Sequence, residues 1–300
     1  MTTAKPLVVV AGATGDLGSR IVQALVANGT RTKVLVRRGA RRDTLPRSVE
    51  VVEVDYTQKR LLQAALRDAT CVVSAVNGLD DVVIDLQSRL LDASVAVGMP
   101  RFIPSDFSLD FTHTRPGRNR NLDLRRTFKT QVDAAPIAAT SILNGAFADL
   151  LAGQAPIVLP SIKRILYWGS ADQRYDFTTK DDVAAYTAAA AIDSETPRIL
   201  RIAGDTVSPR DLAGIMTNLT NTRYRLLRAG GLAGLGLLIG VARTVAPQPK
   251  AIFPAWQGMQ YLRDMSSGEG ELSPLDNDRY GNRPWTSASA VLAEAFGGKP

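Results

Sequence analysis

Short apolar runs alternate with longer amphipathic segments over the first half of the chain. The runs have the length and β-branched composition of buried strands, whereas the amphipathic segments repeat apolar residues every three or four positions, as helices do. This alternation is typical of a parallel sheet with helices on both faces. The predicted strands are 8–11, 33–37, 49–54, 71–76, 101–104 and 139–143, and the predicted helices are 20–28, 61–69, 82–97 and 124–134.

The pattern loosens in the second half of the chain. Residues 164–168 and 199–202 have strand character, and an alanine-rich helix lies between them. A further helix is predicted over 212–219, because Ser208 supplies a hydroxyl cap that is followed by a proline and, three positions on, by an acid. From Tyr224 onward the chain is rich in Gly, Pro, Trp and Met, which favours a smaller, mainly helical cap.

These elements predict an α/β protein with two parts. Residues 1–150 are expected to form a doubly wound parallel sheet of the Rossmann type. Residues 151–300 are expected to form a smaller cap or substrate region, mainly helical. As an alternative for part of that region, the strands at about 164–168 and 199–202 return to the main sheet.

A glycine motif lies between the first predicted strand and the first predicted helix. Gly12, Gly15 and Gly18 stand in the spacing G-x-x-G-x-x-G. The first glycine allows a tight turn, the second lets the backbone approach a pyrophosphate, and the third lets the helix pack closely on the strand. Because the helix amino terminus then faces the phosphates, the motif predicts a dinucleotide site; the alternative is a tight turn without a ligand.

Basic residues follow the second predicted strand, where ribose specificity is usually set. An acid at this place accepts hydrogen bonds from a free 2′-hydroxyl, whereas arginine accommodates a 2′-phosphate. Six of the twelve residues from 31 to 42 are basic and none is acidic. The sequence therefore predicts NADP(H) rather than NAD(H), with Arg37 as the main ligand of the 2′-phosphate and Arg38 beside it; the alternative is a solvated basic edge.

Two later strand ends extend the expected cofactor surface. Asp55 closes the third predicted strand and is placed to reach the adenine, with a turn cap as the alternative role. Asn77 follows the fourth predicted strand. Since ligands of this fold lie beyond the carboxyl ends of the strands, Asn77 is expected along the ribose and nicotinamide side.

With these features, residues 101–107 (RFIPSDF) and 140–147 (TSILNGAF) resemble the NmrA-like and isoflavone-reductase-like branch of the atypical short-chain dehydrogenase/reductases. The resemblance covers about residues 6–215. It implies that the first segment ends a strand over the nicotinamide and that the second lines the floor of the substrate cleft. The positions expected to contact the cofactor are Gly12, Thr14, Gly15, Asp16, Leu17, Gly18, Arg37, Arg38, Asp55, Asn77, Ser105, Asp106, Phe107, Asn144 and Phe147.

The catalytic residues that the resemblance implies are matched less completely in this chain than the residues expected to contact the cofactor. No tyrosine of the chain has a lysine four positions later, so the Tyr-x-x-x-Lys pair of ordinary short-chain dehydrogenases is absent. Reductases of the similar branch use a lysine from the helix before Thr140. The place of that lysine falls on Arg125 or Arg126, and the only lysine of the helix is Lys129. Lys129, Ser105 and Arg125 are the catalytic candidates, with a solvated surface lysine as the alternative for Lys129.

Composition argues against several other functions. Cys71, the single cysteine, lies in an apolar run and allows no internal disulfide, so we expect a reducing compartment, the cytoplasm. His113, the single histidine, lies in a polar loop, and we expect no metal site and no Ser-His-Asp triad. The net charge of +7 is not gathered in one run, so no specific nucleic-acid binding is expected. The uncharged stretch 229–242 is shorter than the roughly 20 residues that a membrane helix needs.

Two functions remain open. The first is an NADPH-dependent reductase that acts on a small, partly apolar carbonyl or alkene held under the Trp- and Met-containing cap. The second is an NmrA-like sensor that binds NADP(H), changes shape and acts on a protein partner without turnover. The aromatic C-terminal region favours the enzyme, and the missing Tyr–Lys pair favours the sensor. We favour the enzyme slightly, as a monomer or homodimer that binds no membrane.

Overall fold

The computed structural model describes residues 5–297, and these residues divide into two compact units. The chain passes between the units several times. The first unit contains the residues up to Phe107, together with 124–142 and 180–200. The second contains 108–123, 143–179 and the residues from Arg201 onward. Each unit is therefore assembled from segments that are distant in sequence.

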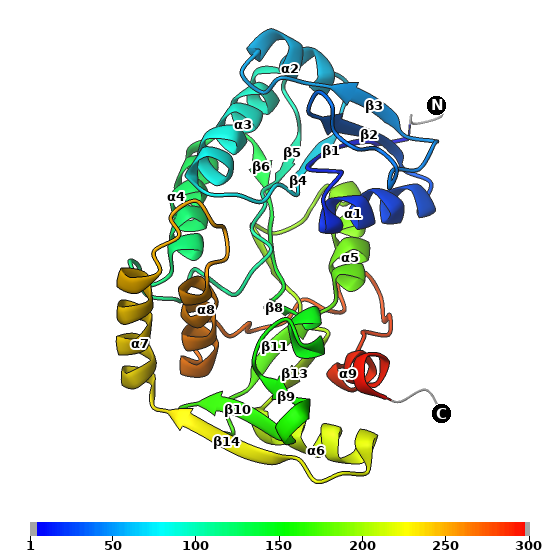
Figure 1. Cartoon of the computed structure of the whole chain (residues 1–300). Coiled ribbons are helices and arrows are strands. Elements are labelled where there is room, and N and C mark those ends of the chain that lie inside the picture. The colour runs from blue at the N-terminus through cyan, green and yellow to red at the C-terminus, as the bar shows by residue number, and fades with distance from the viewer. Residues whose placement is uncertain (1–4, 298–300) are drawn as a thin grey trace. The chain divides into compact units, whose positions relative to one another are not determined.

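A six-stranded parallel sheet forms the centre of the first unit (Figure 1). Its order is β3-β2-β1-β4-β5-β6, and every neighbouring pair is parallel. The order confirms the predicted Rossmann-type sheet, in which ligands bind where the chain reverses its winding direction, between β1 and β4. The strands are β1 (Leu7–Ala11), β2 (Arg31–Val36), β3 (Glu50–Glu53), β4 (Cys71–Ser74), β5 (Arg101–Ile103) and β6 (Ala138–Ala139).

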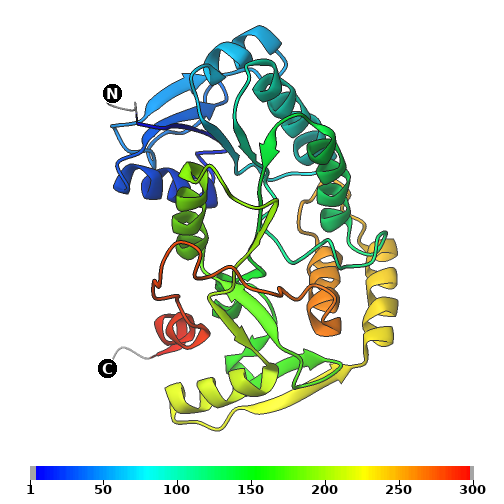
Figure 2. The same ribbon diagram turned by 180° about the vertical axis from the view of Figure 1, so that it is seen from behind.

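Helices cover both faces of this sheet (Figures 1 and 2). In β1 the side chains of Val9 and Ala11 join the core under α2, α3 and α4, and those of Val8 and Val10 point to the opposite face because strand residues alternate. On that opposite face α1 packs against α5, which comes from much later in the chain. The helices are α1 (Asp16–Ala27), α2 (Lys59–Leu66), α3 (Gln87–Ala96), α4 (Arg120–Ala134) and α5 (Lys180–Ile192).

One predicted helix has an irregular beginning. The segment predicted as helix 82–97 starts with a π-helical turn, Asp81–Leu86, and continues as α3. Gln87 follows this wide turn and is fully buried, and its side-chain amide donates to the carbonyl oxygen of Val83 at 2.8 Å. Wide turns of this kind are frequent at functional sites because they shift the residues that follow from their regular helical positions.

The prediction of one continuous strand over 139–143 is wrong. The segment divides at Thr140 into β6, which pairs with β5, and β7 (Ser141–Leu143), which pairs with β12 (Ile199–Arg201). The backbone N–H of Thr140 donates to Phe102 at 3.0 Å, and its hydroxyl donates to the carbonyl oxygen of Pro197 at 2.9 Å. Because one bond runs to β5 and the other to the segment just before β12, the chain leaves the main sheet at Thr140.

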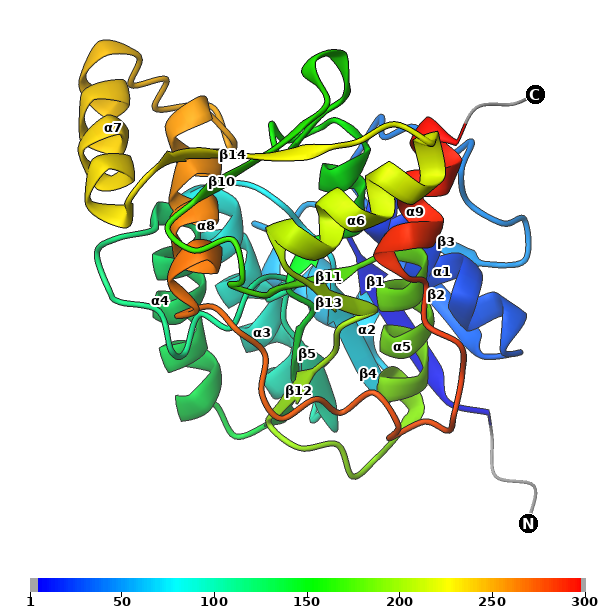
Figure 3. The same ribbon diagram turned by 90° about the horizontal axis from the view of Figure 1, so that it is seen from below.

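The second unit combines two small sheets with helices (Figure 3). One sheet has the order β14-β10-β9 and the other the order β13-β11-β8, and each contains one parallel and one antiparallel pair. Helices α7 and α8 pack against each other. The elements are β8 (Ala146–Phe147), β9 (Val158–Leu159), β10 (Arg164–Trp168), β11 (Tyr175–Thr178), β13 (Asp205–Val207), α6 (Pro209–Thr220), β14 (Arg225–Gly230), α7 (Leu232–Val245), α8 (Ala255–Ser267) and α9 (Ala288–Phe296).

The structure confirms the mainly helical character of the C-terminal region and adds a strand to it. β14 was not predicted, because an edge strand with mostly exposed side chains lacks the alternation of apolar and polar residues. The predicted cap of α6 is confirmed: Asp211 N–H donates to the Ser208 hydroxyl, and Ser208 N–H donates to the Asp211 carboxylate. Within residues 5–297, every helix is too short or too polar to cross a membrane.

Candidate active site

The glycine turn, residues 12–18, connects β1 with α1 in a space that only glycine can occupy at two positions. Gly12 has a φ of +78°, and a Cβ atom there would lie 2.5 Å from the carbonyl oxygen of Ala75, at the end of β4. A Cβ atom at Gly18 would lie 2.1 Å from the carbonyl oxygen of Gly12. Both distances are far below van der Waals contact, so these glycines let the turn pack against the neighbouring strand and helix.

The third glycine begins α1. Gly15 is the N-cap of the helix and provides no side-chain cap, and it is exposed together with Thr14 and Asp16, while Leu17 is half-buried. The first N–H groups of α1 therefore have no capping side chain and carry the positive end of the helix dipole. This geometry fits a phosphate group, which accepts hydrogen bonds from such a helix end.

Asp16 places a carboxylate in the first turn of the same helix, where it would repel a phosphate. Two cations neutralise it: the Lys180 ammonium at 2.6 Å and the Arg20 guanidinium at 2.8 Å. These two hydrogen bonds hold the pKa of the Asp16 carboxyl below its usual range. Arg20 also contacts Asp181, the next residue in the first turn of α5. Sequence reasoning missed Lys180, because nothing local to residue 16 indicates which later helix packs there.

The basic residues after β2 fall into two groups. Arg41 pairs with Asp43 and Arg42 pairs with Glu53. Arg37 and Arg38 are exposed, and no hydrogen bond or ion pair engages their side chains within the described residues. These two arginines, which directly follow the strand, therefore have guanidinium groups available to an anionic ligand.

The two remaining residues predicted at strand ends have different surroundings. Asp55 accepts hydrogen bonds from the N–H and the hydroxyl of Thr57, at 2.9 and 2.6 Å, and these bonds lower the pKa of its carboxyl. Asp55 thus caps a turn, which was the alternative role, and its contact with adenine stays a prediction. Asn77 is exposed just beyond β4.

Ser105, a catalytic candidate, is held tightly after β5. Its hydroxyl donates to the carbonyl oxygen of Val76 at 2.6 Å, and its N–H donates to the side chain of Gln87 at 2.9 Å. Gln87 was not predicted as a site residue. The helical spacing of Val83, Gln87 and Leu90 was the available signal, because it puts a polar side chain on the buried face of α3.

Asp106 lies in a polar network that extends from β5 to α4. Its carboxylate accepts a hydrogen bond from the Ser141 hydroxyl at 2.5 Å, and Ser141 in turn accepts one from Arg198 at 2.7 Å. Arg198 also contacts Asp133 at 2.7 Å. Burial raises the pKa of the Asp106 carboxyl, while Ser141 and the positive charges of Arg125, Arg198 and Lys129 act in the opposite direction.

The helix α4 supplies the two other catalytic candidates. Lys129 is about one quarter exposed, and its ammonium group contacts Asp133 at 2.5 Å. Arg125 is nearly buried, and its positive charge acts on Asp106, as that of Lys129 does. The first unit therefore brings Arg125 and Lys129 around the carboxylate that directly follows Ser105. Ser141 and Arg198 were not predicted, because their positions depend on how separate segments pack. Asp133 was missed although it lies one turn after Lys129 on α4, a spacing at which side chains on a helix meet.

Asn144 and Phe147 belong to the second unit. Asn144 is fully buried in a tight turn: its carbonyl oxygen accepts from the Thr178 hydroxyl at 2.7 Å. The next residue, Gly145, has a φ of +67°, and a Cβ atom there would lie 2.3 Å from the carbonyl oxygen of Asp176. Phe147 lies in β8 and is half-buried, whereas Phe107, in the first unit, is buried.

The single cysteine and the single histidine, from which we expected no disulfide, no metal site and no Ser-His-Asp triad, lie in a buried strand and in a loop, as predicted. Cys71 is buried in β4, and burial raises the pKa of its thiol to about 12. His113 is exposed in its loop, with Nδ1 3.4 Å from a carboxylate oxygen of Asp110, and Asp110 is paired with Arg201. Among the residues that the structure describes, no three His, Cys, Asp or Glu side chains form a group that could hold a metal ion.

Comparison with known proteins identifies one family. The sequence profile of the NmrA-like family matches residues 4–228. Pinoresinol reductase 1 of Arabidopsis thaliana is 30% identical over an alignment of 240 residues, which covers 72% of this chain and 72% of that one. The crystal structure of an isoflavone reductase has a TM-score of 0.80 at 18% identity, covering 97% of this chain and 99% of that one. A leucoanthocyanidin reductase of Vitis vinifera, solved with NADPH, has a TM-score of 0.76 at 18% identity, covering 96% and 99%.

The raised pKa of Asp106 predicts how stability depends on pH. Because the folded carboxyl binds its proton more tightly than the unfolded one, stability falls as pH rises from the ordinary pKa of 3.8 to the raised value. The substitution Asp106→Asn removes this loss, and its amide oxygen can still accept from Ser141. We therefore expect the Tm of the variant, relative to that of the unmodified protein, to increase as the pH rises above 3.8.

The measurement is thermal unfolding followed by circular dichroism at several pH values. Asp92→Asn, which makes the same substitution at an exposed carboxylate on α3, is the matched control. A Tm difference for Asp106→Asn that is constant or falls with pH would show that the folded carboxyl does not have a raised pKa.

Proposed function

This chain belongs to the NmrA-like family, and we propose that it is an NADPH-dependent reductase of a small, partly apolar carbonyl compound or alkene. The observation that carries the proposal is the glycine turn, in which Gly12 and Gly18 pack without space for a side chain and the uncapped start of α1 lies at the switch point of the sheet. Reductases among the relatives support the same reaction class.

The residues around the glycine turn fit NADP(H). The first N–H groups of α1 suit the pyrophosphate, and Lys180 and Arg20 offset the charge of Asp16 in that turn. Arg37 and Arg38 suit the 2′-phosphate, because their guanidinium groups are exposed and carry no carboxylate partner within the described residues. The Vitis vinifera relative was solved with NADPH, which supports this choice of cofactor.

NADPH, when bound, supplies a hydride, and the protein must then stabilise negative charge on the substrate. Both donors of Ser105 are already used, one by Val76 and one by Gln87, so Ser105 serves best as a fixed part of the site. Lys129 is the better donor, because an ammonium group has three N–H bonds and the contact with Asp133 uses one of them. Arg125 contributes a permanent positive charge but is a poor proton donor.

The sensor remains the second candidate for one specific reason. Arg125 or Arg126 stands in the place of the catalytic lysine of the similar reductases, and an arginine stays protonated at neutral pH and is therefore a poor proton donor. A sensor would bind NADP⁺ and NADPH with different affinities and would require a protein partner but no substrate. Turnover therefore separates the two candidates.

We further propose which part of the chain binds the cofactor, which part binds the substrate, and in which compartment the protein acts. The part up to about residue 150, which includes Asn144 and Phe147, is assigned to the cofactor. The part that follows is assigned to the small-molecule substrate, except for segment 180–200, which belongs to the unit of the glycine turn and supplies Lys180 to it. The buried, unpaired Cys71 suits a reducing compartment, and we assign the protein to the cytoplasm, as a monomer or homodimer.

The proposed role of Arg37 predicts a selective loss of affinity. Arg37→Asp replaces an exposed cation with an acid that repels a 2′-phosphate and can accept from a 2′-hydroxyl. We expect the Kd for NADPH to rise by about 100-fold, since two charge-assisted contacts of ~1.5 kcal/mol each are lost, and the Kd for NADH to change little or fall. Fluorescence titration of both nucleotides gives the two constants.

The control is Arg31→Asp, which makes the same charge change at the opposite end of β2. This variant should bind NADPH within about twofold of the unmodified protein, because its charge is distant from the carboxyl ends of the strands. Equal losses for NADPH and NADH in Arg37→Asp would refute the assignment of Arg37 to the 2′-phosphate.

The proposed role of Lys129 predicts a loss of turnover without a loss of cofactor. In a panel of aldehydes, ketones and conjugated enones, at least one compound should oxidise NADPH. Lys129→Ala should lower kcat for that compound by about 100-fold or more, the usual contribution of a general acid, and leave the Kd for NADPH unchanged. The reaction is followed by the decrease in absorbance of the reduced nicotinamide of NADPH.

Lys59→Ala, at an exposed lysine in the first turn of α2, is the control and should keep full activity. If no compound oxidises NADPH although NADPH binds, the sensor replaces the reductase. If turnover occurs but Lys129→Ala retains it, another group donates the proton and the assignment of Lys129 fails.

A further inference from the structure

The second unit contains a pocket of about 660 Å³ that none of the features above uses. Three arginines, Arg115, Arg118 and Arg263, contribute to its lining, together with one turn of α7 and the end of α8. The volume lies in the range of small-molecule sites, which are usually 300–1,000 Å³, as a general estimate. All lining residues belong to the second unit, so the pocket is complete within it.

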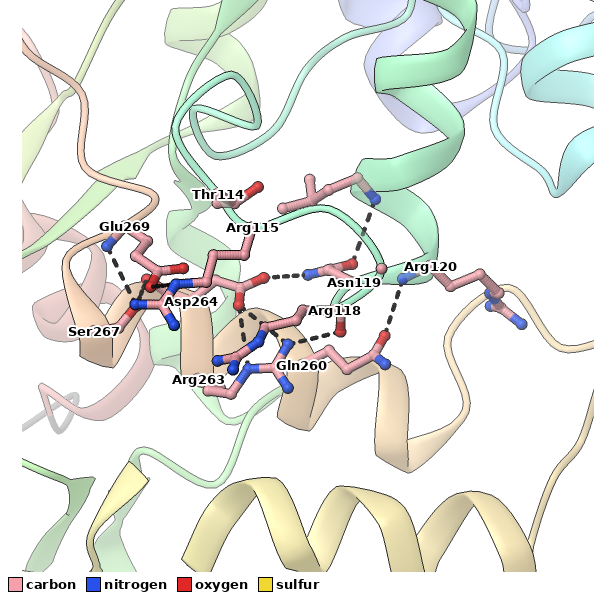
Figure 4. Close-up of polar contacts among 12 residues, drawn as sticks. Thr114, Arg115, Arg118, Asn119, Arg120, Gln260, Arg263, Asp264, Ser267 and Glu269 are labelled. Carbon is pink, nitrogen blue, oxygen red and sulfur yellow. Dashed lines mark hydrogen bonds and ion pairs between the residues drawn. The ribbon is translucent and has the colours of Figure 1, made fainter. Parts of the chain in front are cut away.

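Buried polar side chains of α8 hold the loop that carries two of these arginines (Figure 4). Asn119 donates to the Asp264 carboxylate at 2.7 Å and accepts from the side chain of Gln257 at 2.7 Å. The backbone N–H of Arg120 donates to Gln260 at 3.1 Å. Gln257, Gln260 and Asp264 lie on one face of α8, and each is at most 2% exposed. Because buried polar groups are costly, such a network indicates a loop with a defined position.

The charges around the pocket do not balance. Arg115 pairs with Glu269 at 2.7 Å, and Arg263 contacts Asp264 at 3.3 Å and donates to the carbonyl oxygen of Arg118 at 2.6 Å. The guanidinium group of Arg118 has no hydrogen bond or ion pair within residues 5–297 and is exposed. Three guanidinium groups therefore face two carboxylates, and Arg118 supplies the surplus positive charge.

The opposite wall of the pocket is apolar and open. It is formed by Leu232, Ala233 and Gly236 from the start of α7. Gly236 lines the pocket, and a Cβ atom added there would meet no atom within 4 Å. The N-cap of α7 is Gly231, which supplies no side-chain cap, and the helix end adds positive potential to that of Arg118.

We propose that this pocket binds an organic anion. A carboxylate, or a similar oxyanion, pairs with Arg118 near the start of α7, and a compact apolar body lies against Leu232, Ala233 and Gly236. Arginine suits this role because its planar guanidinium group donates two parallel hydrogen bonds to a carboxylate. The proposal concerns the second unit alone and does not depend on the reductase function.

The first experiment uses 2-naphthoate as a probe and its neutral analogue, 2-naphthamide, in calorimetric titrations of the full chain with saturating NADP⁺ and without it. The two probes share an apolar body and differ in charge. We expect 2-naphthoate to bind about tenfold or more tightly than 2-naphthamide, the effect of one charge-assisted contact. Inorganic phosphate alone should compete only weakly, because it lacks the apolar body.

Two variants locate the probe. Arg118→Ala should raise the Kd for 2-naphthoate by about tenfold. Gly236→Leu should abolish its binding, because the new side chain fills the open space without a clash. The matched controls are Arg223→Ala, at an exposed arginine outside the pocket, and Gly240→Leu, one turn further along α7, where a Cβ atom also meets no atom within 4 Å. Both controls should bind 2-naphthoate within about twofold of the unmodified chain.

Three outcomes would overturn the proposal: no detectable binding of 2-naphthoate, equal affinities for the acid and the amide, or equal effects of the pocket and control variants. The Kd for NADPH, measured in the same proteins, keeps this test separate from the proposed function. Arg118→Ala and Gly236→Leu should leave that constant unchanged. A failure of NADPH to bind would count against the reductase but not against the anion pocket.

Discussion

The first unit depends on one close approach, that of the β1–α1 turn to the end of β4. Parallel pairing places Ala11 beside Ser74, so the turn that follows β1 meets the backbone of Ala75 directly. Gly12 has no Cβ atom to clash with Ala75, and Gly18 has none to clash with Gly12. Helix α1 can therefore start immediately after the strand, with its positive end at the edge of the sheet where Rossmann-type folds bind phosphates.

This constraint determines several other features. Since α1 begins at Asp16, a carboxylate stands at the helix end, and Lys180 from α5 is needed beside it together with Arg20. The packing of α5 on α1 therefore brings Lys180 to the carboxylate in the first turn of α1. It also explains why a segment from residues 180–200 belongs to the unit that contains the glycine turn.

Much of the main sheet was predictable because its signals are local. Apolar runs of β-branched residues indicated the strands, and the spacing of Gly12, Gly15 and Gly18 required a strand before it and a helix after it. The cap of α6 was predictable for the same reason, since Ser208 and Asp211 act on each other across one turn. Each of these signals is contained in fewer than about ten residues, within one element and its turn.

The rest of the site is made of contacts between distant segments, and no local pattern encodes them. Lys129 is a surface lysine by its sequence, and its contact with Asp133 is local to α4. Only the packing of α4 against the segment before β12 joins this pair to Arg198 and Ser141. The division of the strand at Thr140 has the same origin, because its hydroxyl bonds to Pro197. Local patterns thus identified candidate residues, whereas the partners that define their chemistry depend on tertiary packing.

The arginines of this protein differ in whether the fold already engages their guanidinium groups or leaves them available to a ligand. Arg101 is buried and donates to the carbonyl oxygen of Ala190 and to the hydroxyl of Thr140. Its guanidinium group is therefore already engaged within the first unit. Arg37 and Arg118 are exposed at the ends of well-held segments, one after a buried strand and one in a loop fixed to α8. A net charge of +7 that is not gathered in one run gives little attraction for a polyanion, but it places single guanidinium groups where a small anion can meet each of them. The anion binding that we propose at Arg37 and Arg118 therefore depends less on the total charge than on which arginines the fold leaves without a carboxylate.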